Sequence, residues 1–340
     1  MRKSTFFVFI LLKMARLLNG TTDDEDFSQP EMGNNDTETS PCPSQLPTVI
    51  EYLNGIDLIL TVIIAITIIL SVGTVVVCIR NVRLVLGHTP KRYKTKSILV
   101  LVIYPIVTML AIVSILIPKS YFVCDTVSHI YFMISAYVFY SLIMDYIGGE
   151  DAFIKSSDTE TFTARTPPCC CCLPFLKRST VTKNRLLFVR LLILQLPIVQ
   201  SSLFIGLNVV YVEDVLNFNR ILTFFVPFIV VSIILGVWGL NIIVRMVGPL
   251  HVELKLMGKY AVLQLVLILC KIQPLIIMGL VTYITPRCDF PLTLQVQKNA
   301  VFQMCLCAEM LLLSLWASHL YKTPSKTRQL LAKTEPSGTF

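Results

Sequence analysis

The sequence predicts an all-α integral membrane protein with seven transmembrane helices, an extracellular N-terminus and a cytoplasmic C-terminus. Three observations lead to this prediction: long apolar runs, a low content of charge, and a bias of lysine and arginine toward alternate connections. Hydrophobic residues make up 54% of the 340 residues and charged residues only 15%, whereas a soluble domain carries about 25% charged residues. Most charges lie between the apolar runs, as in multi-spanning membrane proteins.

Seven apolar runs are long enough to cross the hydrocarbon core, which takes about 20 helical residues. Four of them contain a proline, which predicts a kink in the helix; these are Pro105, Pro197, Pro227 and Pro274. The runs predict a transmembrane domain over residues 51–322 and a cytoplasmic tail over residues 323–340. They are Ile56–Ile79, Ile98–Ile117, Tyr121–Ile147, Leu186–Tyr211, Ile221–Val244, Tyr260–Ile284 and Asn299–Tyr321.

The distribution of basic residues predicts the orientation. Nineteen of the 29 lysines and arginines lie in the connections after the first, third and fifth runs or after the seventh. Only four lie in the connections on the opposite side. Because lysine and arginine accumulate on the cytoplasmic side of a membrane, the N-terminus is predicted outside, and residues 148–185 form a cytoplasmic, cysteine-rich loop.

Residues 1–50 are predicted to form an extracellular segment. Asn19 and Asn35 each begin an Asn-x-Thr glycosylation pattern within an acidic stretch rich in serine and threonine. At the start of the chain, Arg2 and Lys3 precede the short apolar run Phe6–Leu12. That run is either a weak signal sequence or a snorkelling extension, and it is too short for an eighth span.

The cysteines divide by predicted compartment. Four consecutive cysteines lie in the cytoplasmic loop, where adjacent thiolates cannot easily converge on zinc and a reducing compartment disfavours disulfides. Their position beside basic residues and the membrane favours S-acylation, with an unmodified reduced cluster as the alternative. Outside, Cys42 and Cys288 are the favoured disulfide pair, and Cys124 is expected to be buried. The acylation candidates are Cys169, Cys170, Cys171 and Cys172.

Two ionisable residues are predicted close to the middle of the membrane. Lys271 and Glu309 lie on successive spans of opposite direction, so an ion pair between them would reduce the cost of burying each charge. Gln264 shares a helix face with Lys271, and Gln273 places an amide beside a proline kink. A polar patch lining a substrate path and a purely structural ion pair are both open interpretations.

Other ionisable residues lie near the ends of the spans, where snorkelling to the interface is the simpler interpretation. Among these, Asp145 is retained as a further candidate for the substrate path. The group comprises Asp57, Asp125, His129, Asp145 and Arg190.

The chain lacks the sequence motifs of the common enzyme classes. It has no phosphate-binding loop, dinucleotide fingerprint, His-Glu-x-x-His helix or serine elbow, and it has only four histidines. Its basic residues do not form a patch with aromatic residues, which disfavours nucleic-acid binding. No enzyme, metal or cofactor is therefore expected.

Seven spans with an outside N-terminus also suggest a receptor of the G-protein-coupled type. The details fit poorly, because Asp145-Tyr146-Ile147 stands where such a receptor has an acidic-Arg-Tyr motif, and the last predicted span has no proline. The connection at residues 212–220 has no cysteine to bond to the start of the third span. The receptor remains the alternative.

A series of motifs resembles the alpha subunits of the organic solute transporter family, over approximately Ile56 to Tyr321. The resemblance implies a seven-helix subunit that requires a small single-span beta subunit. It also implies facilitated, bidirectional transport of bile acids, conjugated steroids and related organic anions across the basolateral plasma membrane, without a coupled ion. The motifs are Asp145-Tyr146-Ile147-Gly148-Gly149, Thr166-Pro167-Pro168 with the cysteine run, Met257-Gly258 followed by Gln264, Gln273-Pro274 and Cys307-Ala308-Glu309.

Two departures from the family pattern bear on the substrate. Residues 1–40 differ from the usual N-terminus, and Lys271 stands where a small residue is expected before the Gln-Pro motif. A cation at that position either binds a sulfate or carboxylate or neutralises Glu309. The chain is thus either the main alpha subunit or a divergent paralogue, and membrane lipid would contact its acylated loop.

Overall fold

A computed structural model describes residues 47–156, 161–162, 179–180, 182–213, 215–248, 252–284 and 293–321. Within these residues, seven helical segments are long and apolar enough to cross a membrane, which confirms the seven predicted spans. They are α3 (Leu58–His88), α4 (Lys91–Leu101) with α5 (Ile103–Leu116), α6 (Tyr121–Ile147), α8 (Lys183–Gln195) with the π-helical turn η2 (Leu196–Gln200) and α9 (Ser201–Glu213), α10 (Val215–Val247), α11 (Leu256–Ile284) and α12 (Leu294–Tyr321).

Short elements join the long helices. The helices are α2 (Val49–Asn54), η1 (Pro118–Ser120), α7 (Glu150–Ser156) and η3 (Val252–Leu254). The two-residue strands β1 (Thr161–Phe162) and β2 (Ser179–Thr180) pair antiparallel. The predicted bounds of α6 match the structure, whereas α3 continues beyond Ile79 through the charged residues Arg80 and Arg83, because a helix need not end where the apolar residues end.

Prolines interrupt two of the spans. Pro105 has no N–H to offer the carbonyl of Leu101 one turn earlier, and α4 ends at Leu101. The thiol of Cys78 on α3 lies 3.8 Å from that carbonyl oxygen and donates to it instead. Pro197 lies in the π-helical turn η2 between α8 and α9. Pro227 and Pro274, by contrast, lie inside α10 and α11, which continue past them.

Two glycines end α6. Gly148 and Gly149 have φ angles of 94° and 108°, in the left-handed region that residues with a side chain rarely adopt. The N–H groups of Gly148 and Gly149 donate to the carbonyls of Asp145 and Met144, which satisfies two carbonyls of the last helical turn. This capping explains the Gly-Gly pair in the sequence.

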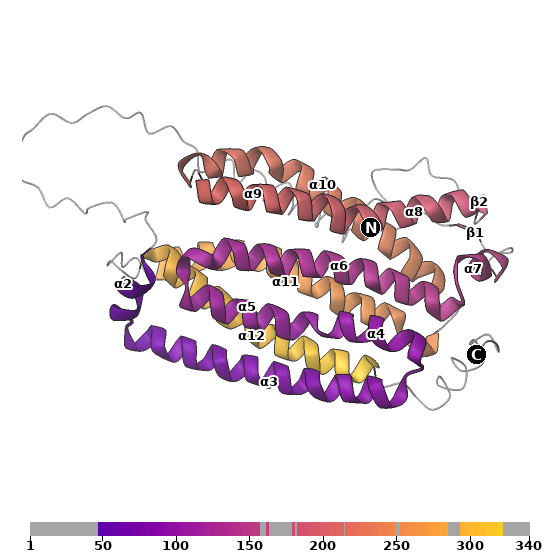
Figure 1. Ribbon diagram of the computed structural model, residues 1–340, viewed down its shortest axis with the longest axis horizontal. Helices are drawn as coiled ribbons and strands as arrows, with labels where there is room; N and C mark the ends of the chain where they lie inside the picture. Colours follow the sequence, from indigo (N-terminus) through magenta and orange to yellow (C-terminus); the bar gives the residue numbers. More distant parts are fainter. Residues whose placement is uncertain are drawn as a thin grey trace, which may run out of the picture.

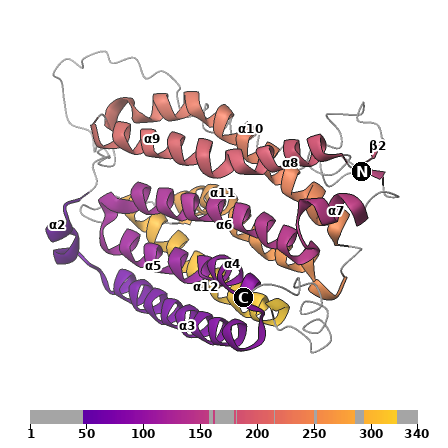
Figure 2. The same ribbon diagram turned by 45° about the vertical axis from the view of Figure 1, so that its right-hand side comes forward.

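The long helices form two groups that lie side by side (Figures 1 and 2). The first, here called the bundle, comprises α3, α4, α5, α6, α11 and α12, with α12 packed on α3, α5 and α11. The second, here called the hairpin, comprises α8, η2 and α9, which pack along α10. Figures 1 and 2 both place the hairpin along the α6 side of the bundle, away from α3.

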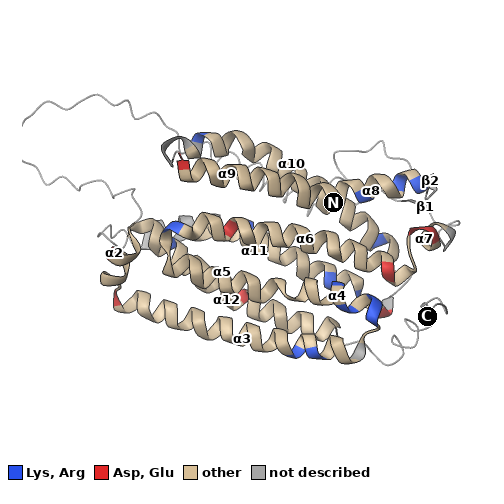
Figure 3. Cartoon of the chain, in the orientation of Figure 1, with Lys and Arg blue, Asp and Glu red and all other residues tan. Residues whose placement is uncertain are grey.

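Basic residues gather at one end of both groups, here called the basic end (Figure 3). They include Arg80 and Arg83 on α3, Arg92 and Lys96 on α4, and Arg185 on α8. The sides of the helices are apolar and exposed: Ile69, Val212 and Phe224 are 70%, 76% and 65% exposed. Such surfaces suit the hydrocarbon of a bilayer.

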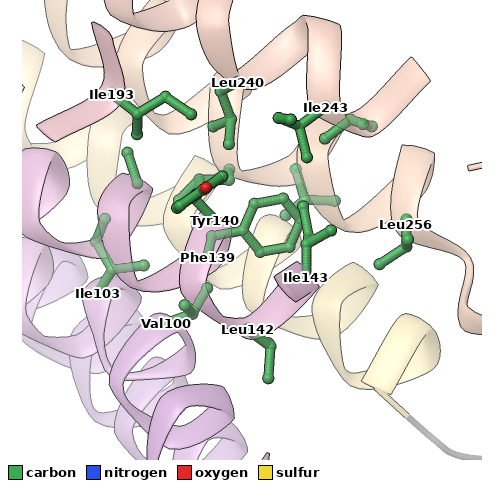
Figure 4. Packing of buried hydrophobic residues seen from close by; sticks show 14 of the residues in the cluster. Val100, Ile103, Phe139, Tyr140, Leu142, Ile143, Ile193, Leu240, Ile243 and Leu256 are labelled. Carbon is green, nitrogen blue, oxygen red and sulfur yellow. The ribbon is translucent and has the colours of Figure 1, made fainter. Parts of the chain in front are cut away.

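Toward the basic end, the hairpin and the bundle share one hydrophobic core. Ile193 of α8 and Leu240 and Ile243 of α10 point toward Phe139, Tyr140 and Ile143 of α6 (Figure 4). These side chains are 2% exposed or less. Within the hairpin, Gly236 allows α10 to approach η2 closely, since a Cβ on Gly236 would lie 2.2 Å from Cγ of Leu196.

Candidate functional site

An ion pair joins α11 to α6 inside the membrane-spanning region. Nζ of Lys271 lies 3.0 Å and 3.3 Å from the two carboxylate oxygens of Asp125. The two side chains are 25% and 38% exposed, respectively. The ammonium also lies 5.2 Å from the ring centroid of Phe204 on α9, an arrangement in which the aromatic face attracts a cation. Lys271 therefore connects three spans.

A buried histidine lies one helical turn from Asp125. His129 is 3% exposed, and its Nε2 lies 3.3 Å from Oε1 of Gln200 in η2. Its ring packs on Phe204 at a centroid distance of 4.3 Å. Gln200 is fully buried, and its amide donates to the carbonyl of Ile229 on α10 at 2.9 Å. Asp125, His129, Gln200 and Lys271 are here called the polar layer.

The π-helical turn explains the position of Gln200. Such turns insert an extra residue into an α-helix and often occur at functional sites. Here the turn contains Pro197, and it joins the two halves of the fourth span. On its α8 side, Gln195 and Ser232 exchange hydrogen bonds of 2.8 Å and 2.7 Å between the two arms of the hairpin. Gln195 therefore links α8 to α10 within the hairpin, whereas Gln200 links the hairpin to α6 of the bundle.

Apolar residues enclose the polar layer on both sides along the helix axes. Toward the basic end lies the shared hydrophobic core. Toward the other end, rings of α6, α9 and α10 form a second group, in which Phe122 and Phe218 are 4.9 Å apart at their centroids and Tyr211 lies 5.1 Å from both. This group is here called the aromatic cluster: Tyr121, Phe122, Leu207, Tyr211, Phe218 and Phe225.

Two small cavities adjoin the ion pair. The larger has a volume of about 20 Å³ and the smaller about 10 Å³. Asp125, Ser128 and Cys270 line both cavities, and Lys271 lines the smaller. A cavity of this size holds at most about one water molecule. Any larger solute requires the surrounding helices to move apart.

Lys271 and Glu309 do not pair with each other, so the interpretation of the two as an ion pair is wrong. Lys271 pairs with Asp125, and Glu309 instead accepts a 2.9 Å hydrogen bond from the amide of Gln273. The reason is helical geometry: residues two positions apart on a helix point about 200° apart. Lys271 therefore faces α6 while Gln273 faces α12, and one face of α11 cannot hold both interactions.

The interpretation of Asp125 and His129 as interfacial snorkelling residues is also wrong. Both belong to the polar layer, on the inner face of α6 toward the hairpin and α11. Their spacing of four residues puts them on the same helix face, and this pattern is the signal in the sequence that could have indicated their shared position. No sequence pattern indicated Gln200, because its position depends on the π-helical turn.

The remaining candidates lie elsewhere. Asp145 is at the basic end of α6, where it pairs with Lys96 and, at 3.5 Å, with Arg92. Gln264 is on α11, seven residues and about 10 Å along the helix from Lys271. The candidate glycosylation, disulfide and acylation residues lie outside the described residues; they are Asn19, Asn35, Cys42, Cys288 and Cys169, Cys170, Cys171 and Cys172.

The polar layer places charged and polar side chains inside the membrane-spanning region. It combines one cation with its carboxylate partner, an imidazole and an amide that bond to each other, and an aromatic face, in apolar surroundings. Among the described residues, no group of three or more His, Cys, Asp or Glu side chains could hold a metal ion. The arrangement suits recognition of a solute by charge and apolar contact.

Comparisons with known proteins identify similar chains. Residues 63–327 match the family model "Organic solute transporter Ostalpha". An organic solute transporter alpha-like protein of Drosophila melanogaster is 34% identical over 82% of this chain and 85% of its own length. The organic solute transporter subunit alpha of Danio rerio is 26% identical over 83% of this chain and 88% of its own length. No solved structure matches the chain.

Proposed function

Because the chain belongs to the organic solute transporter alpha family, we propose that it is the alpha subunit of a facilitative, bidirectional transporter. Its proposed substrates are bile acids, conjugated steroids and related organic anions, and its proposed partner is a single-span beta subunit. The family is one of membrane transporters, which is not an enzyme class. The comparisons give no support to the receptor alternative.

The ion pair of Lys271 and Asp125 is the observation that carries this proposal. A sulfate or carboxylate of the substrate competes with Asp125 for the ammonium of Lys271, while the ring of Phe204 offers an apolar face to a steroid skeleton. In the absence of substrate, Asp125 neutralises the lysine and keeps the cost of its burial low. The pair is therefore exchangeable, which a facilitative carrier needs in order to release its substrate on either side.

The enclosing apolar groups suggest how the site opens. Separation of the aromatic cluster exposes the polar layer at one end, and separation of the shared core exposes it at the basic end. The hairpin meets the bundle at both places. Opening at one end at a time gives alternating access to a single site. Gln264 and Asp145 lie toward the basic end, on the route from the polar layer to that side of the membrane.

The charge distribution supports a proposed orientation with the N-terminus extracellular and the basic end cytoplasmic (Figure 3). The proposed location is the plasma membrane, on the basolateral side in polarised epithelium. In that orientation Asn19 and Asn35 are glycosylated, Cys42 bonds to Cys288 outside, and the cytoplasmic Cys169–Cys172 run is acylated and contacts membrane lipid.

Replacing all four of these cysteines by serine should abolish thioester-linked palmitate.

Uptake measurements test the proposed function. Cells that express this chain with a beta subunit should take up taurocholate or a steroid sulfate, and cells that express the chain alone should not. Preloaded cells should release the same solute when the gradient is reversed. Ligand-evoked G-protein signalling without flux, in either set of cells, would contradict the proposal and favour a receptor.

A further inference from the structure

Glu309 of α12 and Gln273 of α11 form a carboxyl–amide pair. Two of its buried polar atoms have no hydrogen-bond partner among the described residues. Nε2 of Gln273 donates to Oε1 of Glu309 at 2.9 Å. The other two polar atoms of this pair, Oε2 of Glu309 and Oε1 of Gln273, are buried without a partner. Both are acceptors when Glu309 is ionised, so neither can satisfy the other.

No cation compensates Glu309 in the part of the chain that the structure describes. Lys271 is engaged by Asp125, on the opposite side of α11. The helices packed against α12 are α3, α5 and α11. On α5 there is no charged residue, and on α3 Arg80 bonds Ser318, about 2.5 turns along α12 from Glu309. The other lysine of α11, Lys259, lies over the ring of Tyr321, about three turns from Glu309. The titratable groups near Glu309 are the thiols of Cys270 and Cys305.

We propose that Glu309 and Gln273 form a binding site for a single proton, in which Glu309 is a neutral carboxylic acid at neutral pH. The proton resides on Oε2 of Glu309 and is donated to Oε1 of Gln273, while the amide continues to donate to Oε1 of Glu309. The two side chains then exchange two hydrogen bonds, as a carboxylic acid and a primary amide do when they pair edge to edge. One proton satisfies both unpartnered atoms and removes an uncompensated charge from the membrane interior.

This site has a consequence for the polar layer two residues away on α11. A neutral Glu309 leaves Lys271 and Asp125 as the charged groups of that region, so an incoming anion meets no second carboxylate. An ionised Glu309 would repel the anion through a medium of low dielectric constant. The inference about flux rests on the proposed function, whereas the protonation of Glu309 does not.

Infrared spectroscopy of the full chain in lipid vesicles tests the protonation directly. The wild type at neutral pH should show a carbonyl stretching band of a hydrogen-bonded carboxylic acid, which disappears in Glu309→Gln. The matched control Asp125→Asn should keep the band, because Asp125 pairs with the ammonium of Lys271 rather than with Gln273. In Gln273→Leu the band should move to higher wavenumber, since the acid loses its partner. A spectrum that is unchanged by Glu309→Gln, or a band that disappears in Asp125→Asn, would overturn the proposal.

Flux measurements test the consequence in vesicles that contain the chain and its beta subunit. Glu309→Gln preserves both hydrogen bonds to Gln273, so uptake of a steroid sulfate should remain within about twofold of the wild type. Wild-type uptake should fall as the pH is raised, and uptake by the variant should not fall with it. Loss of uptake in Glu309→Gln at normal expression would show that the charge is needed and would overturn the proposal. A wild type that shows the infrared band but no flux would refute the proposed function alone.

Discussion

The bundle and the hairpin are held together in different ways. Within the bundle, α12 contacts α3, α5 and α11 along its length, and its buried side chains form continuous packing. Between the hairpin and α6, by contrast, two apolar zones are separated by the polar layer of Asp125, His129, Gln200 and Lys271. We therefore propose that the bundle serves as a scaffold and that helices part around the polar layer, where α6 and α11 of the bundle meet the hairpin.

The two ion pairs of α6 show the same contrast at a smaller scale. Asp145 at the basic end has two cations, Arg92 and Lys96, on the neighbouring helix α4 of the bundle. Asp125 has one, Lys271, which also lies over a ring of the hairpin. The negative charge of Asp145 is balanced by two cations, which suits a structural contact between α6 and α4. Lys271 is the one cation that balances Asp125, so in the proposed mechanism a substrate anion can replace Asp125.

A loss of stability is expected from filling the contact inside the hairpin. Gly236→Ala places a Cβ 2.2 Å from Cγ of Leu196, and overpacking of this kind costs about 1–3 kcal/mol. Gly206→Ala in α9 is the matched control, because nothing lies within 4 Å of the added Cβ, and a helical alanine stabilises by roughly 0.5–1 kcal/mol. The thermal midpoint in detergent should fall for the first and not for the second. Equal midpoints would mean that Gly236 is not a packing position.

A loss of stability of at least similar size separates the two glutamines. Gln200→Leu removes the hydrogen bonds to His129 and Ile229, and each buried group left without a partner costs about 1–3 kcal/mol. Gln195→Leu removes only bonds to Ser232 within the hairpin. Both variants should lower the thermal midpoint, but only Gln200→Leu should also reduce uptake at matched surface expression. If both reduce uptake equally, the polar layer has no special role at the boundary.

The smallest effect concerns the competition for Lys271. Asp125→Asn removes the anion that competes with substrate, and a partly exposed ion pair contributes up to about 1 kcal/mol, which corresponds to a roughly fivefold lower KM. Glu150→Gln is the control, because it removes only an ion pair with Arg190 outside the polar layer, and its KM should equal that of the wild type. A higher KM for Asp125→Asn would show that Asp125 orients the lysine for the substrate rather than competing with it.

The spans could be predicted from the sequence because each is a local property of about 20 apolar residues. The interruption of the second span by Pro105 and the glycine cap of α6 follow from equally local rules. Lys271 was also found, since a charge within an apolar run is visible in one dimension. Its partner was not, because the choice between Asp125 and Glu309 depends on the face of α11 that meets α6. Gln200 depends on the π-helical turn around Pro197, which no hydrophobic period reveals.

The KM for a steroid sulfate in Lys271→Met, compared with Lys96→Met, tests the role of the polar layer. Both variants remove a lysine that pairs with an aspartate of α6, but only Lys271 also lies over a ring of the hairpin. A charge-assisted contact contributes about 1.5–3 kcal/mol, so Lys271→Met should raise the KM by at least about tenfold at matched surface expression. Lys96→Met should change it by less than about twofold, because Arg92 still compensates Asp145. Equal KM values for Lys271→Met and the wild type would contradict the assignment of the anion site.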